Sequence, residues 1–486
     1  MHMSDSASIM APFFANQSCD PFTPASTFCT LGNYVRYAVA ATRTEHVVAA
    51  INFAKRHNIR FVIRNTGHDY LARSTGAGAL SIWTHKLKSM QFKTWRDAYY
   101  TGSAVKVGAG VQGFEVLAEA KNRGLVVVTG ECSTVGLAGG YTQGGGHSAL
   151  STSFGLSADN TLEFEVITAA GRLVRATRTQ NSDLYWALSG GGGGNYGVVV
   201  SLTVKTFPDR KIGGVSLSFF SHEVPTEQFY AAIDAFHAAL PTMVDAGSMV
   251  VYYFTSTFFM IAPLTAYNKS RAEVEAIMAP YVATLTAMNV THNVAYSETA
   301  NYWDHYDQYF GPLPNGAIQI GIAQYGGRLV PRRTVTNSAS AATLASTARF
   351  IAEQGVTWIG VGTDVSRFGR NRSNSVLPAW RDALVHVTLT TPWSFDPAQW
   401  GAMLDYQGFM TNTIMPAIEA ATPGSGAYMN EADFQQPNFQ REFFGSNYNQ
   451  LLGIKRKYDP DSFFYASKAV GSERWNVRNN GKMCRA

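Results

Sequence analysis

A short segment of the chain places a reactive histidine beside a glycine in a way that suits the binding of an anionic or aromatic molecule. Within residues 64–70, Gly67 permits close backbone approach, and His68 can act as a nucleophile towards an electrophilic ring methyl group. Three neighbours can donate hydrogen bonds to phosphate oxygens, namely Arg64, Asn65 and Thr66. Taken alone, the segment also fits a surface loop with a hydrogen-bonded histidine, so its meaning depends on the rest of the chain.

A second segment, residues 130–147, is so rich in glycine that it cannot form a core from side chains. Such a run presents backbone amides to a flat or anionic group instead. Its one cysteine, Cys132, has no second ligand at the spacing of a zinc site. We therefore expect a cofactor site here and no metal.

A third segment, residues 183–199, contains five consecutive glycines at 190–194. A flexible linker has a similar composition. Here Trp186 precedes the glycines and a β-branched strand follows them, which favours an ordered segment with very close backbone approach.

One further glycine pattern, Gly108–Gly113, matches the dinucleotide-binding fingerprint and lies between a predicted strand and a predicted helix. Glu131 lies at roughly the right distance for the acid of that fold. However, the following strand leads directly into Cys132 and a long glycine loop, and the pattern lies deep in the chain. We therefore reject a Rossmann fold.

Hydrophobic periodicity predicts the elements that must position these segments. Helices are predicted at residues 44–58, 113–122, 226–239, 270–288, 339–354 and 448–458, with a helical turn at 183–188. Strands are predicted at residues 60–63, 105–107, 125–129, 162–168, 173–176, 196–207, 248–261, 317–324, 357–361 and 383–390, and a loop region at 129–155. After Pro208 the character changes, which indicates a second domain with mixed helices and strands.

Composition narrows the classes of function. Apolar residues make up 46% of the 486 residues and the net charge is +5 without a basic cluster, which fits a globular protein and disfavours nucleic-acid binding. No apolar run reaches the length of a membrane span. No signal peptide is visible, but Met1–Met3 resembles an added start, and sequons at Asn16, Asn268, Asn289 and Asn371 weakly favour secretion. Cys19 and Cys29 either form a disulfide or are free thiols.

The three glycine segments and the C-terminal residues 444–460 together resemble the berberine bridge enzyme-like branch of the vanillyl alcohol oxidase flavoproteins, closest to its fungal members. The resemblance covers about residues 31–207 and 428–475. It implies an α+β fold: a two-part PCMH-type FAD-binding domain, 1–207 and 427–486, with an inserted substrate domain, 208–426, in which helices cover an antiparallel sheet. It also implies FAD attached at two points, with His68 at the flavin 8α position and Cys132 at C6.

By the same resemblance, further residues contribute to the cofactor site. These are Arg64, Asn65, Thr66, Gly67, Asp69, Gly136, Gly140, Gly145, His147, Gly197, Val199, Asn447 and Tyr448. The expected partners are a small-molecule substrate and dioxygen, and the expected state is a monomer.

The catalytic base is harder to place. The family strand that often carries an acid or amide resembles residues 381–389, where Thr388 stands at the expected position and cannot serve as a base. Tyr428, in a stretch that resembles another family strand, is a candidate if its neighbours lower its pKa. His386 is the second candidate. Tyr428 also fits a packed aromatic side chain.

Val135, three residues after Cys132, occupies the family position that faces dioxygen, where valine is typical of oxidases. We therefore expect an FAD-dependent oxidase that removes hydride from an alcohol, a sugar-like or a secondary-metabolite substrate and produces H2O2. Two alternatives remain open: a dehydrogenase that uses another electron acceptor, and a flavin-bearing binding protein without turnover.

Overall fold

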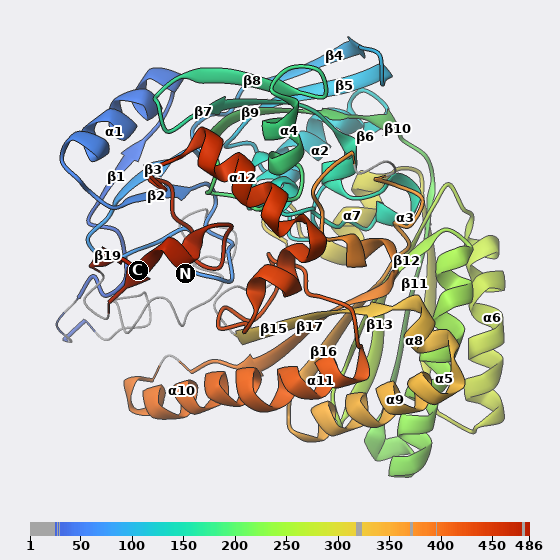
Figure 1. Ribbon diagram of the computed structural model, residues 1–486. Coiled ribbons are helices and arrows are strands. Elements are labelled where there is room, and N and C mark those ends of the chain that lie inside the picture. The colour runs from blue at the N-terminus through green and yellow to red at the C-terminus, as the bar shows by residue number, and fades with distance from the viewer. Residues whose placement is uncertain are drawn as a thin grey trace.

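The computed structural model describes residues 25–26, 28, 30–316, 323–369, 373–394, 396–478 and 482–486. Figure 1 shows two parts, with the N-terminal elements above a large sheet that is covered on its outer side by helices. The predictions for Cys19 and Cys29, for the sequons at Asn16 and Asn371, and for residues 317–322 of the strand predicted at 317–324 concern residues outside these ranges. None of the helices among the described residues combines the length and the apolar character needed to cross a bilayer.

The N-terminal part, residues 30–207, contains a three-stranded parallel sheet, β1-β3-β2, and a five-stranded antiparallel sheet, β4-β5-β9-β7-β8. The strands are β1 (Tyr37–Ala40), β2 (Phe61–Arg64), β3 (Leu80–Trp83), β4 (Met90–Arg96), β5 (Thr101–Gly108), β7 (Thr161–Ile167), β8 (Leu173–Thr177) and β9 (Val198–Lys205). The helices are α1 (Thr44–Arg56), α2 (Gly113–Lys121), α3 (Ser151–Phe154) and α4 (Ser182–Leu188). The β-branched strand β9 is central and almost wholly buried, as its composition predicts.

The sheet part, residues 208–426, contains a seven-stranded antiparallel sheet with the order β14-β11-β13-β12-β16-β17-β15. Its strands are β11 (Ile212–Phe220), β12 (Ser248–Phe254), β13 (Phe258–Tyr267), β14 (Asn293–Thr299), β15 (Ala323–Pro331), β16 (Thr357–Gly362) and β17 (Ala383–Pro392). Its helices are α5 (Thr226–Asp245), α6 (Arg271–Ala287), α7 (Tyr302–Phe310), α8 (Arg332–Thr336), α9 (Ser338–Glu353), α10 (Trp400–Phe409) and α11 (Met415–Ala421).

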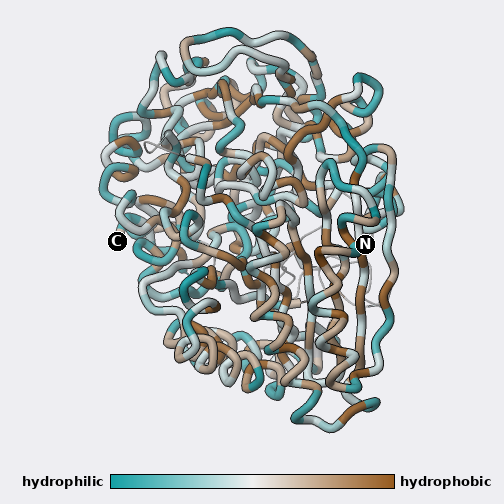
Figure 2. The backbone as a smooth tube through the Cα atoms, turned by 90° about the vertical axis from the view of Figure 1, so that its right-hand side faces the viewer, coloured by the Kyte–Doolittle hydropathy of each residue, from teal (hydrophilic) through white to brown (hydrophobic). Residues whose placement is uncertain are grey.

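A single apolar core joins this sheet to its outer helices, among them α5, α6, α9 and α11, and it includes Phe236, Phe259 and Trp358. Figure 2 shows the hydrophobic residues along the strands, with hydrophilic residues mainly in the outer loops. The opposite face of the sheet turns towards the N-terminal part.

The C-terminal segment, residues 427–486, returns to the N-terminal part, where α12 (Tyr448–Tyr458) packs beside α4 (Figure 1). Lys457 Nζ lies 2.6 Å from Asp183 Oδ2, and the buried Lys455 donates to the Asn195 carbonyl at 2.6 Å. The segment ends in the hairpin β18 (Trp475–Val477) and β19 (Met483–Arg485). This arrangement favours the division of the chain at about residues 207 and 427, and the α+β fold class is confirmed.

Three predictions of local structure were wrong. The strand predicted at 125–129 is only β6 (Leu125–Val126), which pairs with β10 (Phe207–Pro208). The loop predicted at 129–155 contains helical turns at Leu137–Tyr141 and in α3. The strand predicted at 248–261 is the hairpin of β12 and β13, whose turn carries short threonine hydroxyl hydrogen bonds.

The structure explains the glycines of the rejected dinucleotide motif without a nucleotide. A Cβ atom at Gly108 would lie 2.3 Å from the Leu87 carbonyl oxygen, and one at Gly110 would lie 2.0 Å from that of His85. The backbone of residues 85–87 crosses the end of β5 so closely that no side chain fits between them, and both positions therefore require glycine.

Candidate active site

A cavity of about 570 Å³ lies where the three parts of the chain meet. Its size is typical of small-molecule and cofactor sites. The N-terminal part supplies residues of the three glycine segments, the sheet part supplies one face of its strands together with the end of α7, and the C-terminal segment supplies Tyr428–Glu431. A large molecule bound here would contact all three parts at once.

His68 and Cys132 meet in this cavity although they lie on different loops. The Thr134 hydroxyl lies 2.8 Å from His68 Nε2 and 3.7 Å from Cys132 Sγ, so the two side chains contact the same hydroxyl group. His68 Nδ1 is buried and has no hydrogen-bond partner among the described residues. Burial and the nearby positive charge of Arg64 lower the pKa of His68 to about 4, which leaves the imidazole neutral and nucleophilic at neutral pH. Burial also raises the pKa of the Cys132 thiol.

Glycine backbones form one wall of the cavity. A Cβ atom at Gly193 would lie 3.0 Å from Gly140 Cα, so the second and third glycine segments touch through their main chains. A Cβ atom at Gly136 would lie 2.2 Å from Asn65 Oδ1, and this buried oxygen has no partner among the described residues. The absence of side chains and the unsatisfied polar atoms fit a large polar cofactor such as FAD.

Most of the predicted cofactor residues line the cavity. They are Asn65, Thr66, Gly67, His68, Asp69, Cys132, Gly136, Gly140, His147, Gly197 and Val199, and Val135 lines it as well. Four others do not line it: Arg64, Gly145, Asn447 and Tyr448. Asn447 instead donates to the carbonyls of Ser375 and Val376, and the Tyr448 hydroxyl donates to Glu473, so both stabilise the chain around the site.

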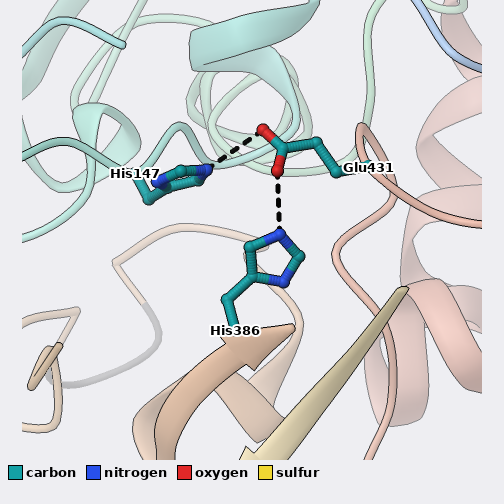
Figure 3. Close-up of side chains that lie close together, drawn as sticks. All are labelled: His147, His386 and Glu431. Carbon is teal, nitrogen blue, oxygen red and sulfur yellow. Dashed lines mark hydrogen bonds and ion pairs between the residues drawn. The ribbon is translucent and has the colours of Figure 1, made fainter. Parts of the chain in front are cut away.

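The cavity contains a charged cluster at its junction with the sheet part (Figure 3). His147 Nε2 donates to Glu431 Oε1 at 3.0 Å, and His386 Nε2 donates to Glu431 Oε2 at 2.9 Å. The Thr388 hydroxyl lies 3.3 Å from the same Oε2. On the other side of His147, Glu131 Oε1 lies 3.5 Å from Nδ1. The two histidines are buried, while 26% of the Glu431 side chain is exposed.

The charges in this cluster are set by the balance between burial and pairing. Burial alone would raise the pKa of Glu431, but the two histidines outweigh it and hold that pKa well below the usual range. Burial likewise opposes the charging of His147, but Glu431 and Glu131 raise its pKa to about 10. Burial lowers the pKa of His386 despite the carboxylate beside it. At neutral pH, Glu431 is therefore ionised, His147 is an imidazolium and His386 is neutral.

Burial disfavours a proton-accepting role for both bases suggested by the sequence, Tyr428 and His386. Burial and the charge of Glu431 raise the pKa of Tyr428 further above its ordinary value, and its hydroxyl accepts a hydrogen bond from Asn430 at 2.8 Å. His386 is completely buried and does not line the cavity. Thr388 lines the cavity as a hydroxyl donor. The carboxylate that is missing at Thr388 is supplied instead by Glu431 from another segment.

Residues 427–433 form turns rather than the strand that the sequence suggested, and for this reason Glu431 was missed. The Glu431 amide donates to the Tyr428 carbonyl at 3.0 Å, and this turn brings the carboxylate to the cavity. A Cβ atom at Gly327 in β15 would lie 2.0 Å from the Glu431 carbonyl oxygen, so the turn packs directly on the sheet. The sequence shows Glu431 only as an acid three residues after Tyr428, and no pattern in it indicates that His147 and His386 are its partners.

The cluster of His147, His386 and Glu431 has two interpretations, a metal site and an ion-pair network. One ligand atom each from His147, His386 and Glu431 lies within 4.8 Å of the others. However, each carboxylate oxygen already accepts a hydrogen bond from a ring nitrogen, and His147 is charged, which excludes it as a ligand until it loses its proton. We therefore interpret the cluster as an ion-pair network.

The comparisons with known proteins agree with this site. The family model described as FAD binding domain matches residues 35–177, and the one described as berberine and berberine like matches residues 427–471. The FAD-linked oxidoreductase ZEB1 of Gibberella zeae is 57% identical over 100% of this chain and 85% of that protein. The FAD-linked oxidoreductase patO of Penicillium expansum is 46% identical over 100% of this chain and 84% of that protein.

A solved structure with the same fold is the VAO-type flavoprotein MtVAO615 from Myceliophthora thermophila C1, crystallised at pH 5.0. It is 42% identical, has a TM-score of 0.95, and the match covers 100% of this chain and 88% of that one.

The ion-pair interpretation predicts that a chelator has no effect. After dialysis against EDTA, the flavin absorption spectrum and the rate of flavin reduction should be unchanged, and elemental analysis should find less than one divalent ion per chain. A stoichiometric ion that is lost in the variant His386→Ala would contradict this interpretation.

Proposed function

Because the chain belongs to the berberine bridge enzyme-like family of FAD-linked oxidoreductases, we propose that it is an oxidase that converts an alcohol to a carbonyl compound. Bound FAD would accept the hydride and pass the electrons to dioxygen, which gives H2O2. The observation that carries the proposal is that the two expected flavin anchors, His68 and Cys132, share one cavity with an ionised carboxylate, Glu431.

We propose that the flavin is attached through both anchors. The 8α and C6 positions lie on one edge of the flavin, so their partners must be close together, and the shared contact with Thr134 supports this. The unpartnered His68 Nδ1 is the atom available for the bond. Two links hold the cofactor without a closed pocket, and the site can then admit a bulky substrate.

Glu431 is the proposed base. Its Oε2 accepts hydrogen bonds from His386 and Thr388, whereas Oε1 accepts one only, from His147, and keeps a lone pair for a substrate hydroxyl. The imidazolium of His147 keeps the carboxylate ionised, and the neutral His386 fixes its orientation from behind. The exposed part of the side chain can therefore take the hydroxyl proton as the hydride departs.

The wall formed by the sheet part favours an apolar alcohol over a sugar. Tyr253, Ile359 and Thr388 form one row across three neighbouring strands, and Tyr325 stacks on Tyr70 at 3.9 Å. Among the described residues of the sheet part, those that line the cavity carry no formal charge. An oligosaccharide needs many hydrogen-bond partners, whereas a flat secondary metabolite with one reactive hydroxyl fits this wall.

We also propose that the protein is a secreted monomer. Two sequon asparagines within the described ranges, Asn268 and Asn289, are exposed, which supports glycosylation at these positions. A dehydrogenase that uses another acceptor, or a flavin-binding protein without turnover, would have the same anchors and is distinguished by the experiments below.

The first prediction concerns the attachment of the flavin. Protein denatured in acid should stay yellow, and each of the variants His68→Ala and Cys132→Ala should retain the flavin through one remaining link. The double variant should release it. Cys484→Ser, which removes the other described free thiol, is the control and should keep both links. Release of flavin from the unmodified protein would contradict attachment.

The second prediction concerns the base. Anaerobic mixing with a panel of apolar alcohols and oligosaccharides should bleach the flavin with apolar alcohols only. With the best substrate, Glu431→Gln should slow flavin reduction by roughly 10²–10⁴-fold because the amide cannot accept the proton. Tyr428→Phe is the matched control and should remain near the unmodified rate. Loss of activity in Tyr428→Phe but not in Glu431→Gln would return the role to the tyrosine.

The third prediction concerns dioxygen. Val135→Leu adds one methylene to a tightly packed wall and should slow reoxidation of the reduced flavin by about tenfold or more, a barrier increase of only about 1.4 kcal/mol. Val361→Leu, on the sheet side of the cavity, should alter flavin reduction but not reoxidation. Stopped-flow mixing of reduced protein with aerated buffer measures both. Slow reoxidation in the unmodified protein would indicate a dehydrogenase.

A further inference from the structure

We propose that Glu131 is a positioning residue that holds His147 in its charged form and in line with Glu431. The proposal rests on the proposed function, in which Glu431 is the base. Glu131 itself lies one residue before Cys132, on the loop that carries one of the two flavin anchors.

The imidazole of His147 lies between two carboxylates. Glu131 Oε1 is 3.5 Å from Nδ1, and Glu431 Oε1 is 3.0 Å from Nε2. A neutral imidazole donates from one nitrogen only, whereas an imidazolium donates from both. With a carboxylate on each side, an imidazolium is attracted to both, and its hydrogen bond from Nε2 aligns it with Glu431.

The remaining groups around His147 do not supply a second negative charge. The ring of His386 lies 5.3 Å away and that of Tyr428 lies 5.5 Å away, and both are neutral. The ring of Trp380, whose centroid lies 6.4 Å from that of His147, carries no charge. Burial also raises the pKa values of the phenols that interact with Glu131, which are Tyr141, Tyr253, Tyr302 and Tyr306. Glu131 and Glu431 are therefore the two groups that hold the pKa of His147 at about 10 despite its burial.

The backbone of Glu131 is fixed from the sheet part. The Tyr306 hydroxyl, on α7, lies 2.7 Å from the Gly130 carbonyl and 2.8 Å from the Glu131 carbonyl. Two residues after Glu131, the Ser133 hydroxyl donates to the Pro314 carbonyl at 2.8 Å. One short loop thus carries a proposed flavin anchor and also sets the charge of the residue that keeps the base ionised.

The substitution Glu131→Gln tests this directly, because it keeps the shape and removes the charge. Loss of an opposite charge at this distance should lower the pKa of His147 by about 1 to 3. In the flavin-loaded protein, this is measured by the histidine 13C resonances across pH, with the His147 signal identified by its loss in His147→Gln. Glu131→Asp should restore much of the original value.

The pH profile of flavin reduction gives a second measurement. In the unmodified protein the rate should fall near pH 10, when His147 loses its proton, is no longer held as a cation between Glu131 and Glu431, and ceases to align Glu431. In Glu131→Gln this decrease should begin 1 to 3 pH units lower. Tyr306→Phe is the control: it loosens the loop but keeps the carboxylate, so it should lower the rate without moving the profile.

An unchanged His147 titration in Glu131→Gln would overturn the proposal, and so would an equal shift in Tyr306→Phe. Because the resonance measurement needs no turnover, its result is independent of whether Glu431 is the base. Whether Glu431 is the base is tested separately: an unchanged rate of flavin reduction in Glu431→Gln would show that it is not.

Discussion

The carboxylate of Glu431, held between His147 and His386, is the constraint on which the arrangement of the molecule depends. Each of the three residues comes from a different part of the chain: the N-terminal part, the sheet part and the C-terminal segment. An ionised carboxylate whose side chain is mostly buried is costly unless it is paired and hydrogen-bonded. Its pairing is complete only when all three parts are docked, so the fold and the charge of the site are established together.

The glycine-rich segments allow the same parts of the chain to pack closely around the expected cofactor site. Gly136 leaves room for Asn65, Gly193 approaches the backbone of Gly140, and Gly327 admits the turn that carries Glu431. At each point a Cβ atom would meet another main chain or a buried side chain. Backbone thus packs closely around a cavity in which some polar atoms, among them Asn65 Oδ1 and His68 Nδ1, have no hydrogen-bond partner within the described part of the chain.

The cavity has a charged end and, opposite it, a face without charged side chains among the described residues. Its charges lie at the junction where Glu131, His147 and Glu431 meet, whereas the sheet face opposite presents aromatic and aliphatic side chains and threonines. Low polarity around the ion pairs strengthens them, because fewer solvent dipoles screen the charges. The wall that would favour an apolar substrate in the proposed function therefore also strengthens the ion pairs at the proposed base.

The sequence by itself determined the family, the FAD-binding character, the α+β class and most helices and strands, because glycine spacing and hydrophobic periodicity are local properties. His68 and Cys132 were identified as candidate flavin anchors for the same reason, and both line the cavity. The charged cluster was decided by tertiary structure alone. Tyr428 and His386 look suitable as bases in the sequence, but burial raises the pKa of the Tyr428 phenol and keeps His386 out of the cavity. Glu431 gained its role from partners 284 and 45 residues away, and no local pattern encodes such distances.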